Sequence, residues 1–172
     1  MPDATGLELI AQAVRAELGD EAVVGTTYYR GQATLEVAPA RVRDVLVYLR
    51  GADEPFDRLM SVHGCDYLPE EPRLGIHYEL LSMERTDRLR VKTRVGVDDP
   101  TVPSVVPVFA GADFHEREVY DMFGVLFDGH PDMRRLLMPE DYEGYPQRRD
   151  FPLGGEPVIF TFNEGKFPRW YD

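Results

Sequence analysis

The sequence predicts an α+β fold in which a mostly antiparallel sheet carries helices on one face and is followed by an extended C-terminal tail. Three observations support this prediction. Apolar residues recur every three or four positions in two segments, as in amphipathic helices, and a third segment has residues typical of helix ends. Between them lie segments rich in Val, Thr and Tyr that are separated by short turns, as in antiparallel strands. From position 128 onward, neither period persists.

The first predicted element is a helix over residues 5–18, whose apolar positions share one face and which Gly19 is placed to end. Residues 22–38 are expected to form two strands joined by a turn at Gly31. Pro39 then opens a second helix, over residues 40–50.

Three further strands are predicted over residues 56–68, 73–83 and 88–97. In the last of them, apolar residues alternate with Arg and Lys, which indicates a strand with one solvated face. The stretch "DDPTVPSVVP" that follows contains three prolines and interrupts the regular structure.

A third helix is predicted over residues 113–123. Asp113 is placed to cap it, and Glu116, three residues later, completes a pattern like a capping box. Gly124 suits the left-handed conformation that often ends a helix.

The chain is therefore divided into an α/β domain, residues 1–127, and an extended C-terminal segment, residues 128–172. The second part holds six prolines, yet it also carries many aromatic residues near its end. Full burial of a large apolar side chain contributes roughly 1.5–3 kcal/mol, so such residues favour contact with a surface. We expect this segment to lie along its own domain or to wrap around a partner.

Composition and charge exclude several classes of function. A net charge of −12 disfavours binding to nucleic acid and unaided binding to anionic membranes. No apolar run reaches the roughly 20 residues that span a bilayer, and the N-terminal sequence does not resemble a secretory or mitochondrial signal. We therefore expect a location in a bacterial-type cytoplasm or in the stroma of an organelle with its own genome. Cys65 is the single cysteine, so neither an internal disulfide nor a four-thiolate iron–sulfur cluster is expected in this chain.

One candidate metal site lies on the third predicted helix. His115, Glu118 and Asp121 are three residues apart in turn and share one helix face, and His130 could supply a fourth ligand. However, Arg117 precedes Asp121 by four residues and is placed to pair with it. Because a guanidinium group competes with a metal for carboxylate oxygens, we favour an ion-pair network.

Two pairs of arginines follow this helix. Arg134 and Arg135 come after a proline, and Arg148 and Arg149 precede Asp150 between prolines. They could be guanidinium forks for carboxylates on a facing surface, or simply a solvated run of charge. Elsewhere, Cys65 beside His63 and Asp66 is expected to be a small buried residue, and His77 a satisfied core histidine. The sequence contains no catalytic motif that we recognise.

The stretch "EREVYDMFGVLFDGHPDMRR" (116–135) resembles the signature of the 30-kDa subunit family of respiratory complex I, the NADH-quinone oxidoreductase. The upstream segments "GCDYL", "HYELLSM" and "DDPTVPSV" and the downstream "LLMPEDYEGYPQRRDFPLGGEP" resemble the same family. The sequence departs from the family pattern at His115, where a bulky apolar residue is usual. It also has Phe109 and Phe114 where tryptophan is expected, and Gln147 where leucine is common.

This resemblance implies a cofactor-free structural subunit in the peripheral arm of the enzyme that passes electrons from NADH to quinone and translocates protons. FMN and the iron–sulfur clusters would belong to partner subunits. The expected partners are the 49-kDa-type subunit and the subunit that holds the terminal cluster, at the cytoplasmic face of a bacterial plasma membrane. No residue would be catalytic or metal-binding. Residues implied to be structural or interfacial are Glu116, Arg117, Glu118, Asp121, His130, Arg134, Arg135, Arg148, Arg149 and Asp150.

Other assignments remain open at this stage. The same role is possible in a related plastid-type, F420-dependent or hydrogenase complex, since no residue of the chain identifies the module that delivers electrons. A stand-alone metalloenzyme using His115, Glu118, Asp121 and His130 is the remaining alternative.

Overall fold

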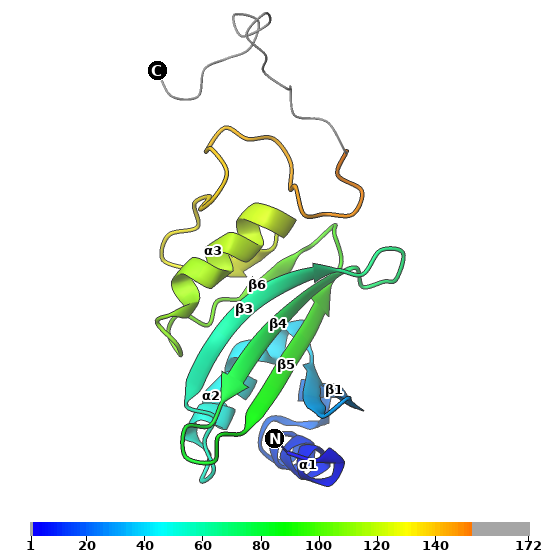
Figure 1. Ribbon diagram of the computed structural model, residues 1–172, viewed down its shortest axis with the longest axis vertical. Coiled ribbons are helices and arrows are strands. Elements are labelled where there is room, and N and C mark those ends of the chain that lie inside the picture. The colour runs from blue at the N-terminus through cyan, green and yellow to red at the C-terminus, as the bar shows by residue number, and fades with distance from the viewer. Residues whose placement is uncertain (1, 153–172) are drawn as a thin grey trace, which may run out of the picture.

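A five-stranded sheet with the order β1-β2-β5-β4-β3 forms the centre of the structure, a computed structural model that describes residues 2–152 (Figure 1). Neighbouring strands are antiparallel, except that β2 and β5 run parallel. The predicted mostly antiparallel sheet is therefore confirmed. Its strands are β1 (Val23–Tyr29), β2 (Gln32–Val37), β3 (Arg58–Asp66), β4 (Leu74–Leu81) and β5 (Arg88–Val95).

Three α-helices lie close to the predicted positions: α1 (Ala4–Leu18), α2 (Val42–Gly51) and α3 (Ala112–Phe123). Short 3-10 turns, Asp20–Ala22 and Pro39–Arg41, follow α1 and precede α2. The Asp3 side chain accepts a hydrogen bond of 2.7 Å from the Gly6 N–H and so caps α1. Gly19 ends α1 as predicted, with a φ of 94° that favours glycine.

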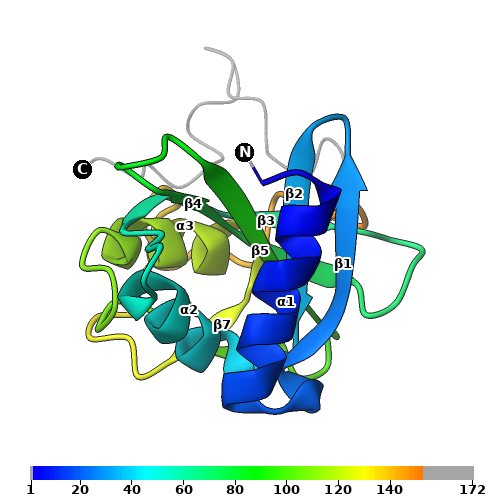
Figure 2. The same ribbon diagram turned by 90° about the horizontal axis from the view of Figure 1, so that it is seen from below.

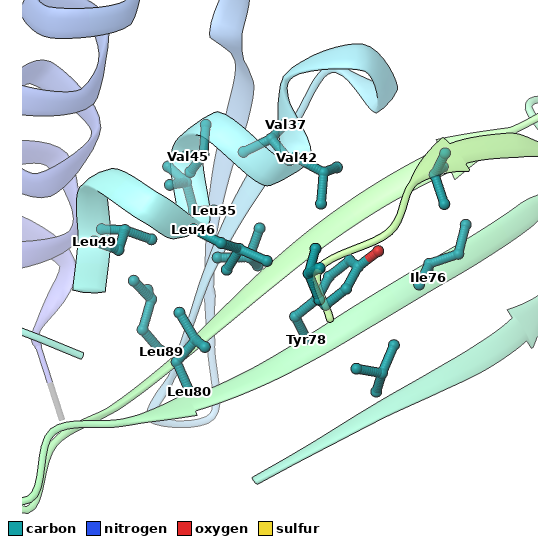
Figure 3. Close-up of a cluster of buried hydrophobic side chains, with 14 of the residues drawn as sticks. Leu35, Val37, Val42, Val45, Leu46, Leu49, Ile76, Tyr78, Leu80 and Leu89 are labelled. Atoms are coloured by element: carbon teal, nitrogen blue, oxygen red, sulfur yellow. The ribbon is translucent and has the colours of Figure 1, made fainter. Parts of the chain in front are cut away.

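The helices cover one face of the sheet, as predicted (Figure 2). Alternate residues of β4, from Leu74 to Leu80, point into this side and are fully buried. They meet the apolar face of α2, and the close-up of the core shows Leu46 and Leu49 directed toward the sheet (Figure 3). Among residues 2–152, no helix covers the opposite face of the sheet.

A second, two-stranded parallel sheet was not predicted. It pairs β6 (Thr101–Pro103) with β7 (Leu126–Asp128), on either side of α3 in the sequence. Strands of three residues are too short to show a period, and β6 lies in the proline-rich stretch. This pairing returns the chain to the start of α3, where the Ser104 N–H donates to the Asp128 carbonyl oxygen at 2.8 Å.

After β7 the chain continues without regular secondary structure along α3 and across one end of the main sheet (Figure 1). We call residues 129–152 the anchored segment. The rest of the predicted C-terminal segment, residues 153–172, includes most of its aromatic residues and lies outside the described part of the chain. Within residues 2–152, none of the helices combines the length and apolar character needed to cross a bilayer.

Gly64 of β3 sets how closely α3 approaches the sheet. A Cβ atom at this position would lie 2.4 Å from the Phe123 ring, so we expect Gly64→Ala to destabilise the fold by about 1–3 kcal/mol through overpacking. Gly25→Ala in β1 is the matched control, because nothing lies within 4 Å of its Cβ position. Urea unfolding of both variants tests this, and equal midpoints would contradict the close approach.

Candidate functional site

The site residues predicted from the sequence lie on α3 and the anchored segment, where Asp121 is the central contact. This carboxylate is fully buried on α3. Its Oδ2 accepts hydrogen bonds from the backbone N–H groups of Leu136, Leu137 and Met138 at 3.0, 2.7 and 2.8 Å, and its Oδ1 accepts one from Arg135 at 2.7 Å. Burial alone would raise the pKa of Asp121, but these hydrogen bonds outweigh it and hold the pKa below its usual range.

The Arg135 guanidinium group extends this contact to the next turn of the anchored segment. It donates to the carbonyl oxygens of Tyr142 and Gly144 at 2.8 and 3.1 Å. It also lies 5.5 Å from the centre of the Tyr145 ring, within range of a cation–π interaction. One arginine therefore links α3 to residues 142–145.

The predicted pairing of Arg117 with Asp121 is wrong. Arg117 instead donates to the carbonyl oxygens of Arg134 and Arg135 at 3.1 and 3.2 Å. Asp121 points into the interior, whereas Arg117 is only half-buried and reaches along the outside of the anchored segment. Arg134 pairs through two bonds of 2.7 Å with Asp132, two residues away. Arg134 and Arg135, two of the arginines predicted to bind carboxylates on a facing surface, thus bind acceptors within this chain.

Asp66, at the end of β3, binds the C-terminal part of the anchored segment near Arg149. It accepts two hydrogen bonds from Arg73, at 2.8 and 2.6 Å, and one of 2.7 Å from the backbone N–H of Arg149. Arg73 is buried and also donates twice to Asp150, at 2.7 and 2.6 Å. The Arg73 hydrogen bonds hold the pKa of Asp66 well below its usual range. Sequence reasoning did not find Arg73, because a single arginine before an apolar strand carries no distinctive signal.

Residues 145–148 close the C-terminal end of α3. Gly124 adopts the predicted left-handed conformation with a φ of 76°, and a Cβ atom there would lie 2.5 Å from the Tyr145 ring. Two orphan carbonyl groups of the last turn find donors in the anchored segment. The Phe123 carbonyl accepts from Arg148 Nε at 2.7 Å, and the Met122 carbonyl accepts from the Gln147 N–H at 3.1 Å.

The predicted capping box at the start of α3 is also wrong. The helix begins at Ala112 after Gly111, and no side chain caps it. Glu116 is fully buried and accepts hydrogen bonds of 2.7 Å from Ser104 Oγ and from the Val105 N–H. It therefore accepts hydrogen bonds from donors in the loop before the helix, and not from the N–H groups of the first helical turn. Burial raises the pKa of Glu116 to about 7, although these two hydrogen bonds oppose the shift.

His130 connects the anchored segment to the same region. Its side chain is fully buried, and its Nδ1 accepts a hydrogen bond of 3.0 Å from the Asp132 N–H. The ring proton is therefore assigned to Nε2, which faces the Asp113 carbonyl oxygen at 3.2 Å and the nearer oxygen of Glu116 at 3.9 Å.

The four residues considered for a metal do not form a site. His115 is half-exposed and Glu118 exposed on the outer side of α3, whereas Asp121 is buried and accepts four hydrogen bonds. Within residues 2–152, no three His, Cys, Asp or Glu side chains are arranged to hold a metal ion. Asp66 and Asp121 are likewise saturated by donors, so neither is free to act as a general base.

Two other sequence predictions differ from the structure. His77 is buried, but it lies on the helix-free face of the sheet and not in the core, and its Nδ1 finds no partner in the described part of the chain. Cys65 is a free thiol that is half-buried, not fully buried as expected.

Removing the charge of Asp121 should loosen the anchored segment. Asp121→Asn keeps the volume, but its NH2 group cannot accept from Arg135 or from backbone N–H groups. We expect a loss of about 3–5 kcal/mol in the free energy of unfolding, because a buried guanidinium loses its partner. Trypsin cleavage after Arg134 and Arg135 should accelerate. Asp141→Asn, on an exposed side chain of the same segment, is the control. Equal cleavage rates would contradict this role.

Glu116 should make stability depend on pH. Its pKa of about 7 in the folded protein exceeds the ordinary 4.5, so the folded state binds more protons between these values. This contribution to stability is present at low pH and is lost as the pH rises toward 7. We therefore expect the Glu116→Gln variant to gain about 3 kcal/mol relative to the original protein between pH 4 and pH 8. Urea unfolding across this range measures the difference, with Glu118→Gln as control. A constant difference would exclude the shifted pKa.

Comparison with known proteins agrees with the resemblance seen in the signature. Residues 35–157 match the family described as respiratory-chain NADH dehydrogenase, 30 Kd subunit. An NADH-quinone oxidoreductase subunit of Roseiflexus sp. (strain RS-1) is 46% identical over 162 residues, covering 91% of this chain and 90% of that protein. The corresponding protein of Roseiflexus castenholzii is 44% identical, and the match covers 85% of this chain and 84% of that protein.

Solved structures show the same fold. A trypsin-resistant fragment of Nqo5 superposes with a TM-score of 0.61 at 30% sequence identity, and the match covers 73% of this chain and 98% of the fragment. A chain of the membrane-bound sulfane sulfur reductase, an archaeal respiratory membrane complex, gives a TM-score of 0.70 over 98% of this chain and 95% of that one. At 24% identity, this second likeness concerns the fold alone. On the sequence matches, the chain belongs to the 30-kDa subunit family of respiratory-chain NADH dehydrogenase.

Proposed function

We propose that this chain is a structural subunit of the peripheral arm of NADH:quinone oxidoreductase. In this role it supports electron transfer from NADH to quinone, coupled to proton translocation, without taking part in the chemistry. The observation that carries the proposal is the fixed course of the anchored segment. Asp121 accepts four hydrogen bonds from residues 135–138 and Asp66 accepts one from Arg149, so five hydrogen bonds to these two carboxylates hold the segment on the domain.

The outer side of this surface has the character of a protein contact. Phe114 on α3 and Leu137 in the anchored segment are 62% and 61% exposed. Large apolar side chains on a rigid backbone favour association, since little conformational entropy is lost when a partner covers them. We expect the 49-kDa-type and terminal-cluster subunits to contact this side, with Arg134, Arg149 and Glu118 at its rim.

The redox groups belong to partner subunits in this proposal. Iron–sulfur clusters are usually held by four thiolates, and the sequence contains one cysteine. FMN and the clusters would therefore be bound by other chains of the arm. The chain would reach the cytoplasmic face of the membrane through these partners, consistent with its net charge of −12.

Removal of residues 153–172 separates folding from assembly. A chain that ends at Pro152 keeps every contact of the anchored segment described above, so its free energy of unfolding should change by less than about 1 kcal/mol. It lacks Phe160, Phe162, Phe167, Trp170 and Tyr171, which we expect to contact a partner. We predict at least a tenfold loss of the tagged chain from NADH dehydrogenase purified from gently solubilised membranes.

The full-length Asp141→Asn variant controls for expression and tagging. Recovery of the shortened chain in the complex at the level of the full-length protein would refute the role of the last 20 residues. Absence of both chains from a complex that contains the flavin and cluster subunits would refute the proposed function itself.

A further inference from the structure

The helix-free face of the main sheet carries an ordered row of cations along β5. Arg88, Arg90, Lys92 and Arg94 are alternate residues of this strand and point away from the helices. In a solvated strand, such side chains are usually mobile. Here the side chains of Arg90, Lys92 and Arg94 are only 28%, 16% and 20% exposed, although no helix covers them among residues 2–152.

Aromatic rings beneath the row account for this order. The Arg94 guanidinium group lies 4.3 Å from the centre of the Tyr67 ring, and Lys92 Nζ lies 5.2 Å from it. Tyr67 in turn is hydrogen bonded to His77 at 3.0 Å, and His63 stacks on His77 with ring centres 5.1 Å apart. Lys92 and Arg94 are therefore held against a ring that is itself fixed by a hydrogen bond.

His77 adds no charge to this base at neutral pH. Burial, together with the nearby His63, Arg90 and Lys92, lowers the pKa of His77 to about 3. Burial also lowers the pKa of His63, which stacks on His77 on the same face. The positive charge of the face at neutral pH therefore comes from the arginines and lysine.

The two central cations of the row pair with acidic residues, whereas within residues 2–152 the two cations at its ends have no acidic partner or only an exposed one. Arg90 pairs with Glu79 of β4, and Lys92 pairs at 3.0 Å with Glu36 of β2. Arg88 is exposed and pairs with no acidic residue in the described part of the chain. At the other end, Arg94 Nη1 reaches only the exposed Glu70, at 3.5 Å, whereas its Nε and Nη2 are buried without a hydrogen-bond partner among the described residues.

Three hollows border the row. One lies between Gln32, Arg88 and Arg90 and has a volume of about 60 Å³. The next, of about 230 Å³, is floored by His77 and Tyr67. The third, of about 280 Å³, lies beside Arg94 and has apolar walls that include Val24, Val37, Pro39 and Pro72. The face is thus a grooved surface and not a flat one, with room for side chains of an extended segment.

From these features we infer that the helix-free face is a second protein-contact surface, which takes an extended acidic segment of a neighbouring subunit. One carboxylate of that segment would pair with the exposed Arg88, and another would replace the exposed Glu70 at Nη1 of Arg94. Three two-residue steps place the two arginines about 20 Å apart along the strand. Its apolar side chains would enter the hollow beside Arg94. This inference rests on the proposed function, since it requires the chain to be part of an assembly.

An acidic protein segment fits this face better than a polyphosphate. Glu36 and Glu79 lie between the cations and would repel a continuous line of phosphates, whereas separate carboxylates can avoid them.

Site-directed crosslinking in the intact complex tests the inference. The full-length chain with Cys65→Ala and Gln32→Cys is labelled with a benzophenone maleimide, assembled in the host, irradiated, and the crosslinked peptides are sequenced. We expect a peptide rich in Asp and Glu from another subunit. Arg88→Glu in the same background should reduce its yield about fivefold or more, whereas Arg15→Glu on α1 should leave it within about twofold.

A second labelling site separates this inference from the proposed function. Leu137→Cys, on the exposed side of the anchored segment, should crosslink to a partner whether or not the sheet face does. Crosslinks from Leu137→Cys without any from Gln32→Cys would overturn the sheet-face inference alone. A crosslink from Gln32→Cys to a basic or apolar segment, to a second copy of this chain, or with a yield unaffected by Arg88→Glu would also overturn it. Failure at both sites would refute the proposed function as well.

Discussion

The structure depends on a simple electrostatic constraint: a carboxylate can be buried as an anion only if hydrogen-bond donors replace the water it loses. Asp121 and Asp66 meet this condition with four hydrogen bonds each, all of them from arginines or from the backbone. All four donors of Asp121 and one of the four donors of Asp66 lie in residues 135–149, so the α/β domain cannot satisfy Asp121 without the anchored segment. The segment in turn has no regular structure of its own, so the two parts depend on each other.

Glu116 shows what happens when donors are fewer. It is as deeply buried as Asp121 and lies on the same helix, but it accepts two hydrogen bonds in place of four. Its pKa is raised to about 7, whereas that of Asp121 is lowered. Desolvation raises the pKa at both sites, and at Asp121 it is opposed by more donors, one of which is the charged Arg135 guanidinium group. The two acidic residues of one helix therefore have different electrostatic behaviour for a reason that the structure makes explicit.

The sequence predicted what depends on local pattern. Hydrophobic period, strand-forming composition and residues typical of helix ends identified the five strands of the main sheet and the three helices, and Gly19 and Gly124 marked two helix ends. Prediction from the sequence failed for contacts between residues that are far apart in the chain. The partner of Asp121 was taken to be Arg117 on the same helix, because spacing along the chain cannot reveal an arginine that folds back from the loop. Arg73 was overlooked for a related reason, since its two acceptors, Asp66 and Asp150, are brought together only by the fold. The signature stretch identified the family without specifying any of these contacts.

The boundary predicted between residues 127 and 128 separates two patterns of sequence, and the hydrogen bonds of Asp121 and Asp66 cross it. This coupling has a consequence for assembly. A segment that orders only on binding loses conformational entropy at that moment, which weakens the interaction. Residues 129–152 are already held by the domain, so their ordering is part of folding and not of association. The surface of the anchored segment is therefore fixed by its hydrogen bonds to the buried aspartates before a partner binds. On the helix-free face of the sheet, the stacked rings fix Lys92 and Arg94 of β5 in the same way. Both sets of contacts fix polar groups in place before a partner binds, which lowers the entropy cost of association for a subunit of a larger enzyme.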